Sequence, residues 1–178
     1  MTIETRAYET DLEVRSAGDG RTVCGICVPY NQVQRINANL SEVFIRGAFA
    51  NVVRASHRVK FLVGHDASAL PIGRATLLRE DEHGLYGEFR ISDTERGSEV
   101  LTLIRDGALS ELSIGFSPLK DKRRQDGVVE RQLAHLAEVS AVTFGAYGAA
   151  AAVVGVREQS TTPNLDALED ILRGVRRA

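Results

Sequence analysis

The sequence predicts a mixed, mainly β fold in a single domain, and three observations support this prediction. The chain has 178 residues, which is the size of one domain with one core. Short apolar segments alternate with turn signals along most of its length, as in antiparallel sheets. Helical periodicity is confined to two short segments among the strands and one segment near the C-terminus.

The chain is predicted to open with a β-hairpin. Residues 3–15 alternate loosely, residues 17–20 are typical of a turn, and residues 22–28 form the next strand. That strand contains Cys24 and Cys27, a C-x-x-C pair that could serve redox chemistry or hold a metal. Because residues three apart on a strand point to opposite faces, and there is no second pair, we expect two ordinary half-buried thiols.

A short helix and a buried strand are predicted next. Phe49, Val52 and Val53 share one helical face, which predicts a helix near residues 47–55. Residues 59–63 form an apolar run that indicates a buried strand, and a loop follows it.

A second hairpin and a longer helix occupy the middle of the chain. Residues 72–78 and 85–91 are predicted strands separated by a glycine-containing turn. Residues 94–106 carry a helical apolar stripe, which Asp93 can cap and Gly107 can end.

The last predicted strands cover residues 109–118 and 128–144, on either side of a polar turn at 120–127. A linker and an amphipathic helix come after them. We therefore divide the chain into a domain at 1–156 and a tail at 157–178, whose apolar stripe must dock on the domain or on a partner.

Composition and missing motifs exclude several functions. There are 22 Lys and Arg against 24 Asp and Glu, a net charge of −2, so nucleic acid is a poor candidate partner. The N-terminus lacks the pattern of a secretory signal, and we expect no membrane segment. Phosphate-binding, dinucleotide-binding and H-E-x-x-H motifs are absent, as is the G-x-S-x-G elbow, so we expect no cofactor and no metal.

Three polar residues in apolar surroundings are candidates for chemistry. His65 directly follows a buried strand, where a rigid scaffold often places functional groups, whereas His57 and His83 are expected to be solvated. Ser113 lies in a predicted strand, and Glu138 is the one carboxylate of the apolar strand segment 133–144, where a charge is costly unless it is paired. These residue types could provide the nucleophile, base and orienting group of a hydrolase.

An ordered set of segments resembles the prohead (capsid maturation) proteases of tailed phages, which are related in fold to the herpesvirus maturational protease, assemblin. The resemblance covers about residues 10–155. The matching segments are Glu42-Val-Phe-Ile-Arg-Gly-Ala-Phe49, Val63-Gly-His65, Ile72-Gly73, Gly84-Leu85, Leu112-Ser-Ile-Gly-Phe116 and Ala137-Glu-Val-Ser-Ala-Val142.

The resemblance implies a compact assemblin-like β-barrel with surrounding helices, and a serine endopeptidase with Ser113 as nucleophile and His65 as base. The herpesvirus relatives have a histidine as third member, whereas Glu138 occupies the similar position here, with His135 as the alternative. These relatives also use an arginine-bearing loop for the oxyanion, which residues 139–156 lack, so backbone N–H groups near Gly115 or Gly145 are expected to serve.

The resemblance also implies partners and a location. Its substrates would be the scaffold and major capsid proteins of a phage or prophage, cleaved inside the immature prohead in the bacterial cytoplasm. We expect self-association as a homodimer or larger assembly, and self-cleavage that could remove the tail. The alternatives are a catalytically inactive barrel of the same fold that binds capsid or scaffold protein, and a Ser-His esterase on another fold.

Overall fold

The computed structural model describes residues 2–9, 12–15 and 18–143; the predicted tail at 157–178 lies outside them. The described residues form one ten-stranded sheet with two α-helices and a short 3-10 turn, η1 (Ser56–Arg58). The mainly β prediction is confirmed. The strands are β1 (Glu4–Glu9), β2 (Glu13–Arg15), β3 (Thr22–Pro29), β4 (Gln34–Asn37), β5 (Leu40–Phe44), β6 (Lys60–Val63), β7 (Gly73–Glu80), β8 (Gly84–Ile91), β9 (Glu111–Arg123) and β10 (Val129–Val142).

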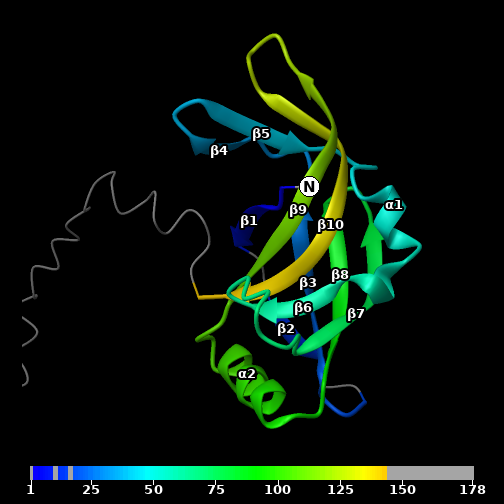
Figure 1. Ribbon diagram of the computed structural model, residues 1–178, viewed down its shortest axis with the longest axis vertical. Coiled ribbons are helices and arrows are strands. Elements are labelled where there is room, and N and C mark those ends of the chain that lie inside the picture. Colours follow the sequence, from blue (N-terminus) through cyan, green and yellow to red (C-terminus); the bar gives the residue numbers. More distant parts are fainter. Residues whose placement is uncertain (1, 10–11, 16–17, 144–178) are drawn as a thin grey trace, which may run out of the picture.

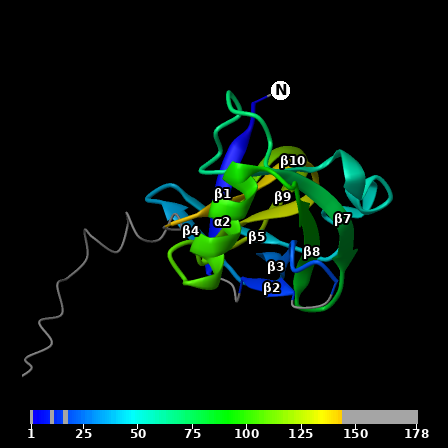
Figure 2. The same ribbon diagram turned by 90° about the horizontal axis from the view of Figure 1, so that it is seen from below.

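The sheet runs in the order β1-β9-β10-β6-β7-β8-β3-β2 and curls into a half-barrel (Figures 1 and 2). Neighbouring strands on this path are antiparallel except β10 and β6, which are parallel. Strand β5 also adds to β10 in parallel, nearer the start of β10, and pairs with β4. One edge of β10 therefore meets β9, and the other meets β5 and then β6.

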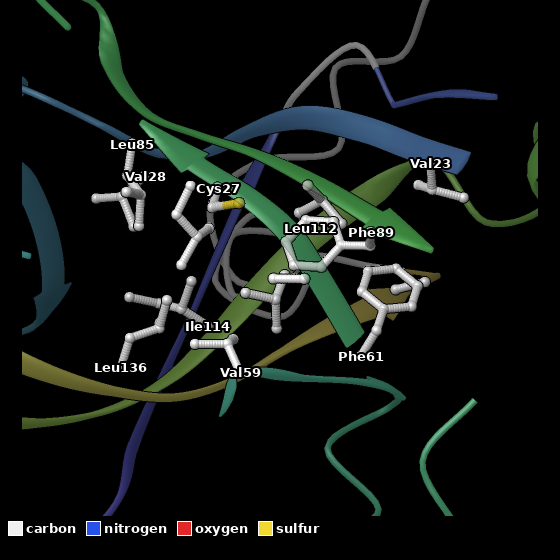
Figure 3. Packing of buried hydrophobic residues seen from close by; sticks show 14 of the residues in the cluster. Val23, Cys27, Val28, Val59, Phe61, Leu85, Phe89, Leu112, Ile114 and Leu136 are labelled. Carbon is white, nitrogen blue, oxygen red and sulfur yellow. The ribbon is translucent and has the colours of Figure 1, made fainter. Parts of the chain in front are cut away.

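The core lies inside this curl, where alternate residues of the strands meet. Figure 3 shows Val23, Cys27 and Phe89 on one side, facing Leu112, Ile114 and Phe61 on the other. The rings of Phe61 and Phe89 have centroids 4.8 Å apart. Since burying each such side chain stabilises a fold by about 1.5–3 kcal/mol, this layer holds the long strands β9 and β10 in place.

The helices lie at the margins of the sheet (Figure 1). Helix α1 (Ala50–Val53) is one turn long, and helix α2 (Glu95–Arg105) buries Val100, Leu101 and Ile104. Thr94, and not the expected Asp93, caps α2: its hydroxyl accepts a hydrogen bond from the Gly97 N–H at 3.0 Å.

Gly107 follows α2 with a φ of 81°, as expected of a residue that ends a helix. Neither α-helix in the described ranges has the length and apolar content needed to cross a bilayer.

The predicted opening hairpin is only partly present, because β2 pairs with β3 whereas β1 pairs with β9. Two further features of the sheet differ from the sequence prediction. Strand β9 continues to Arg123, so half of the expected turn at 120–127 is strand, and the reversal occurs where Gly127 has a φ of 85°. The hairpin of β4 and β5 was not predicted. Both differences arise because β9 and β10 keep pairing beyond the core, with β5 beside them (Figure 1).

Candidate active site

The face of β9 and β10 that points away from the core carries a set of polar side chains. Ser113 alternates with the core residues Leu112 and Ile114 on β9. In the register of the two strands Ser113 lies opposite Ser140, and Gly115 lies opposite Glu138. Because paired residues in a sheet project to the same side, these positions form one small surface.

His65 reaches this surface through an unusual backbone conformation. Strand β6 ends at Val63, and Gly64 and His65 then adopt left-handed φ values of 61° and 60°. Such a φ costs a non-glycine residue about 1–2 kcal/mol. Two hydrogen bonds hold it: Gly64 N–H donates to Ala141 O at 3.0 Å, and His65 N–H donates to Ser140 Oγ at 3.1 Å. The imidazole is thereby directed back over β10.

The His65 ring lies between a hydroxyl and a carboxylate. Its Nε2 is 2.5 Å from Ser113 Oγ, and its Nδ1 is 2.6 Å from Glu138 Oε1. A carboxylate only accepts hydrogen bonds, so it selects the tautomer with the proton on Nδ1 and leaves Nε2 to accept the Ser113 proton. The Ser113 residue is 2% exposed, while the side chains of His65 and Glu138 are 24% and 12% exposed. This arrangement can activate a serine hydroxyl as a nucleophile.

Two further residues fix the carboxylate. The hydroxyl of Ser140, which is fully buried, donates to Glu138 Oε2 at 2.8 Å while accepting the His65 N–H. Gly115 leaves the space for the carboxylate, since a Cβ atom there would lie 2.3 Å from Glu138 Oε1. The Ser140 side chain thus binds both the backbone of His65 and the carboxylate of Glu138.

The other sequence candidates lie apart from this set. His135 is exposed and pairs with Ser117 instead of Gly115. His57 and His83 are also exposed, and Gly145 lies outside the described residues. Gly115 is on β9, which pairs with β1 on one side and with β10 on the other. The side chain that lies against its Cα is that of Glu138.

The two cysteines are free and buried more completely than the half-buried state we expected. Burial raises the pKa of the Cys27 thiol, which disfavours a reactive thiolate. Across the described ranges, no three His, Cys, Asp or Glu side chains gather where they could hold a metal ion.

Neither the role of Ser140 nor this use of Gly115 was predicted from the sequence. A signal for Ser140 was present, because a residue two positions after Glu138 shares its strand face. No sequence signal shows that Gly115 lies opposite Glu138, since that depends on the register of β9 against β10 and on a bulge between Leu136 and Glu138.

Comparisons with known proteins show the family and the fold of this chain. The family model described as caudovirus prohead serine protease matches residues 10–164. The prohead protease of Enterobacteria phage HK97 is 25% identical over 173 residues, covering 95% of this chain and 74% of that protein. The solved structure of the bacteriophage T4 capsid assembly protease, gp21, aligns with a TM-score of 0.56 at 11% identity, covering 79% of this chain and 96% of the other. At 11% sequence identity, this similarity shows a shared fold and nothing further.

Proposed function

This chain belongs to the caudovirus prohead serine protease family, and from that premise we propose that it cleaves phage scaffold and major capsid proteins with Ser113, His65 and Glu138 as its catalytic triad. Membership makes it a serine peptidase of capsid maturation that acts in the phage capsid within the host. The identity of its substrates, the roles of the three residues, and self-cleavage are parts of the proposal. The observation that carries it is the continuous hydrogen-bonded chain from Ser113 Oγ through His65 to Glu138.

In the proposed reaction, His65 Nε2 takes the proton of Ser113 as Oγ attacks the carbonyl carbon of the scissile peptide bond. The tetrahedral intermediate then expels the amine, which receives that proton from His65, and an ester to Ser113 remains. Water attacks this ester with His65 again as base, which releases the new carboxyl end and restores the hydroxyl. Glu138 keeps the Nδ1 proton in place and stabilises the imidazolium in both steps.

The test is coexpression of the chain with the capsid and scaffold proteins encoded beside it, followed by intact mass spectrometry of every product. We expect defined truncations with the unchanged chain and none with Ser113→Ala. The matched control is Ser110→Ala, because Ser110 is an exposed serine three residues away and should be dispensable. Cleavage that persists in Ser113→Ala but stops in Ser110→Ala would show that Ser110, and not Ser113, is the nucleophile.

The same spectra test self-cleavage and the inactive alternative. A form of the chain that ends before Pro163, and that is lost in Ser113→Ala, would support removal of the tail. Uncleaved substrates that nevertheless copurify with the chain from assembled heads would favour a binding barrel without activity.

A further inference from the structure

A cavity of about 230 Å³ opens on the sheet near the proposed triad, and its lining is strongly basic. Lys60, Arg74 and Arg90 contribute to the lining together with the hydroxyl-bearing Ser92, and no acidic residue does. The remaining lining residues are Pro71 and Gly73. We call this the basic pocket.

The strand register connects the basic pocket to the active site. Glu138 on β10 lies opposite Lys60 on β6, Lys60 lies opposite Arg74 on β7, and Arg74 lies opposite Arg90 on β8. The three cations therefore form one row across adjacent strands, which begins beside the carboxylate of the proposed triad. The loop that begins with His65 returns to the sheet at Pro71, on the border of the pocket.

Most of the positive charge in the row lacks a counterion within the described ranges. Arg90 donates to Asp19 Oδ2 at 2.5 Å, whereas Lys60 and Arg74 make no ion pair there. Like charges directly opposite one another on neighbouring strands destabilise a sheet. A bound anion would offset this repulsion with charge-assisted hydrogen bonds.

We propose that the basic pocket binds an acidic side chain of the peptide substrate, at a distance from the scissile bond. With about 4.8 Å between strands and 3.3 Å per residue, Ser113 lies roughly 12 Å from Lys60 and 16 Å from Arg74, or about four residues of extended peptide. This subsite rests on the proposed function, since it requires that Ser113 marks the reaction centre. It would select substrates that carry Glu or Asp about four residues from the cleaved bond.

The experiment uses peptides that span a cleavage site mapped on the natural substrate, with Glu or Gln placed three, four or five residues to either side of the cleaved bond. We expect a preference for Glu over Gln of about tenfold in kcat/KM at one of these positions, as a charge-assisted hydrogen bond provides. The double variant Lys60→Gln with Arg74→Gln should remove this preference, so that the ratio of kcat/KM for the Glu and Gln peptides falls to about one.

The matched control is Lys122→Gln with Arg54→Gln, which removes the same charge from exposed positions outside the pocket. It should keep the preference. In a further variant, Arg74→Glu should reverse the preference, so that a peptide with Lys at the same position is cleaved faster than the Glu peptide. Equal cleavage of all Glu and Gln peptides by the unchanged enzyme, or a preference that survives the Lys60 and Arg74 double variant, would overturn the subsite.

Binding measured by calorimetry on Ser113→Ala separates this proposal from the assignment of the nucleophile. Tighter binding of the Glu peptide that depends on Lys60 and Arg74 supports the pocket whichever residue cleaves. Equal binding of the Glu and Gln peptides contradicts the pocket, while loss of cleavage in Ser113→Ala still supports the proposed function.

Discussion

Two clusters centred on a carboxylate, one buried and one partly exposed, occupy strands β9 and β10 and their neighbours, and they are built differently. In the first, the Glu42 cluster, both carboxylate oxygens of Glu42 accept guanidinium hydrogen bonds from Arg6 and Arg131 at 2.5–3.2 Å. The two arginines also lie over the ring of Phe116. In the second, Glu138 accepts one bond from an imidazole and one from a hydroxyl, and the chain of bonds ends at a serine.

The difference indicates what each cluster does. In the Glu42 cluster every charge faces an opposite charge, and Arg6 and Arg131 also pair with the partly exposed carboxylates of Glu4 and Asp121. Removing the buried Glu42 carboxylate would leave the two buried arginines with only those outer partners, at a cost in stability. In the second cluster the terminal Ser113 hydroxyl bonds, among the residues that the structure describes, only to the base His65, so its removal leaves no charge unpaired. We therefore expect changes in the Glu42 cluster to affect folding, and changes around Ser113 to affect activity.

The largest expected effect comes from Glu138→Gln. The glutamine amide can donate to Nδ1 and select the wrong tautomer of His65, which leaves Nε2 unable to take the serine proton, so kcat should fall by about 10⁴-fold. The melting temperature should stay within a few degrees. Single-turnover cleavage and thermal unfolding measure the two quantities. Glu130→Gln makes the same change on the same strand and should be fully active; equal loss in both variants would contradict the assignment.

The next largest effect is expected for Glu42→Gln, which should lower stability without lowering activity and so distinguish the Glu42 cluster from the cluster around Ser113. Arg6 and Arg131 would lose their buried counterion and keep only the partly exposed Glu4 and Asp121, so we expect the free energy of unfolding in urea to fall by about 3 kcal/mol, the lower end of the cost of breaking a buried ion pair. Cleavage per folded molecule should be retained. The control, Glu88→Gln, breaks a pair with the solvent-exposed Arg15 at 3.0 Å and should cost much less, because water screens an exposed ion pair. Similar costs in the two variants would show that the buried cluster has no special role.

The comparison also shows which parts of the molecule could be predicted from the sequence. Most strands and the helix α2 were predicted because alternation and helical periodicity are local. Glu138 stood out as a lone carboxylate in an apolar strand, and His65 as a histidine at a strand end. Each signal needed only the residue and its immediate neighbours.

What the sequence could not give depends on pairing between distant segments. The hairpin of β4 and β5 is short and polar, and its position follows from Glu42 lying between Arg6 and Arg131. The extent of β9 follows from pairing with β10 beyond the core. The contact of Gly115 with Glu138 likewise requires the register.

Gly115→Ala tests that contact directly. The added methyl group would displace the Glu138 carboxylate, and a shift of about 1 Å in such a group can reduce kcat by about 10²-fold. Shortening the acid in the double variant Gly115→Ala with Glu138→Asp should restore part of the activity, as measured by kcat on the mapped peptide. Full activity in Gly115→Ala alone would show that the carboxylate does not need its present position.

The smallest effect tests whether Ser140 belongs to the catalytic cluster or only to the core. Ser140 touches no substrate and acts as a positioning residue, through the Glu138 carboxylate and the His65 N–H. Losing a hydrogen bond to a charged group costs about 1.5–3 kcal/mol, so Ser140→Ala should lower kcat by at least about tenfold with KM unchanged.

The imidazole Nδ1 proton, observed by NMR, should also shift in Ser140→Ala, because its acceptor moves. The control is Ser117→Ala, since Ser117 is a buried serine on β9 that donates to Thr2 O and lies outside the site. It should lose stability without either of these changes. If Ser140→Ala behaved in the same way as the control, Ser140 would be a core residue, and the left-handed backbone at His65 would not depend on the Ser140 hydroxyl.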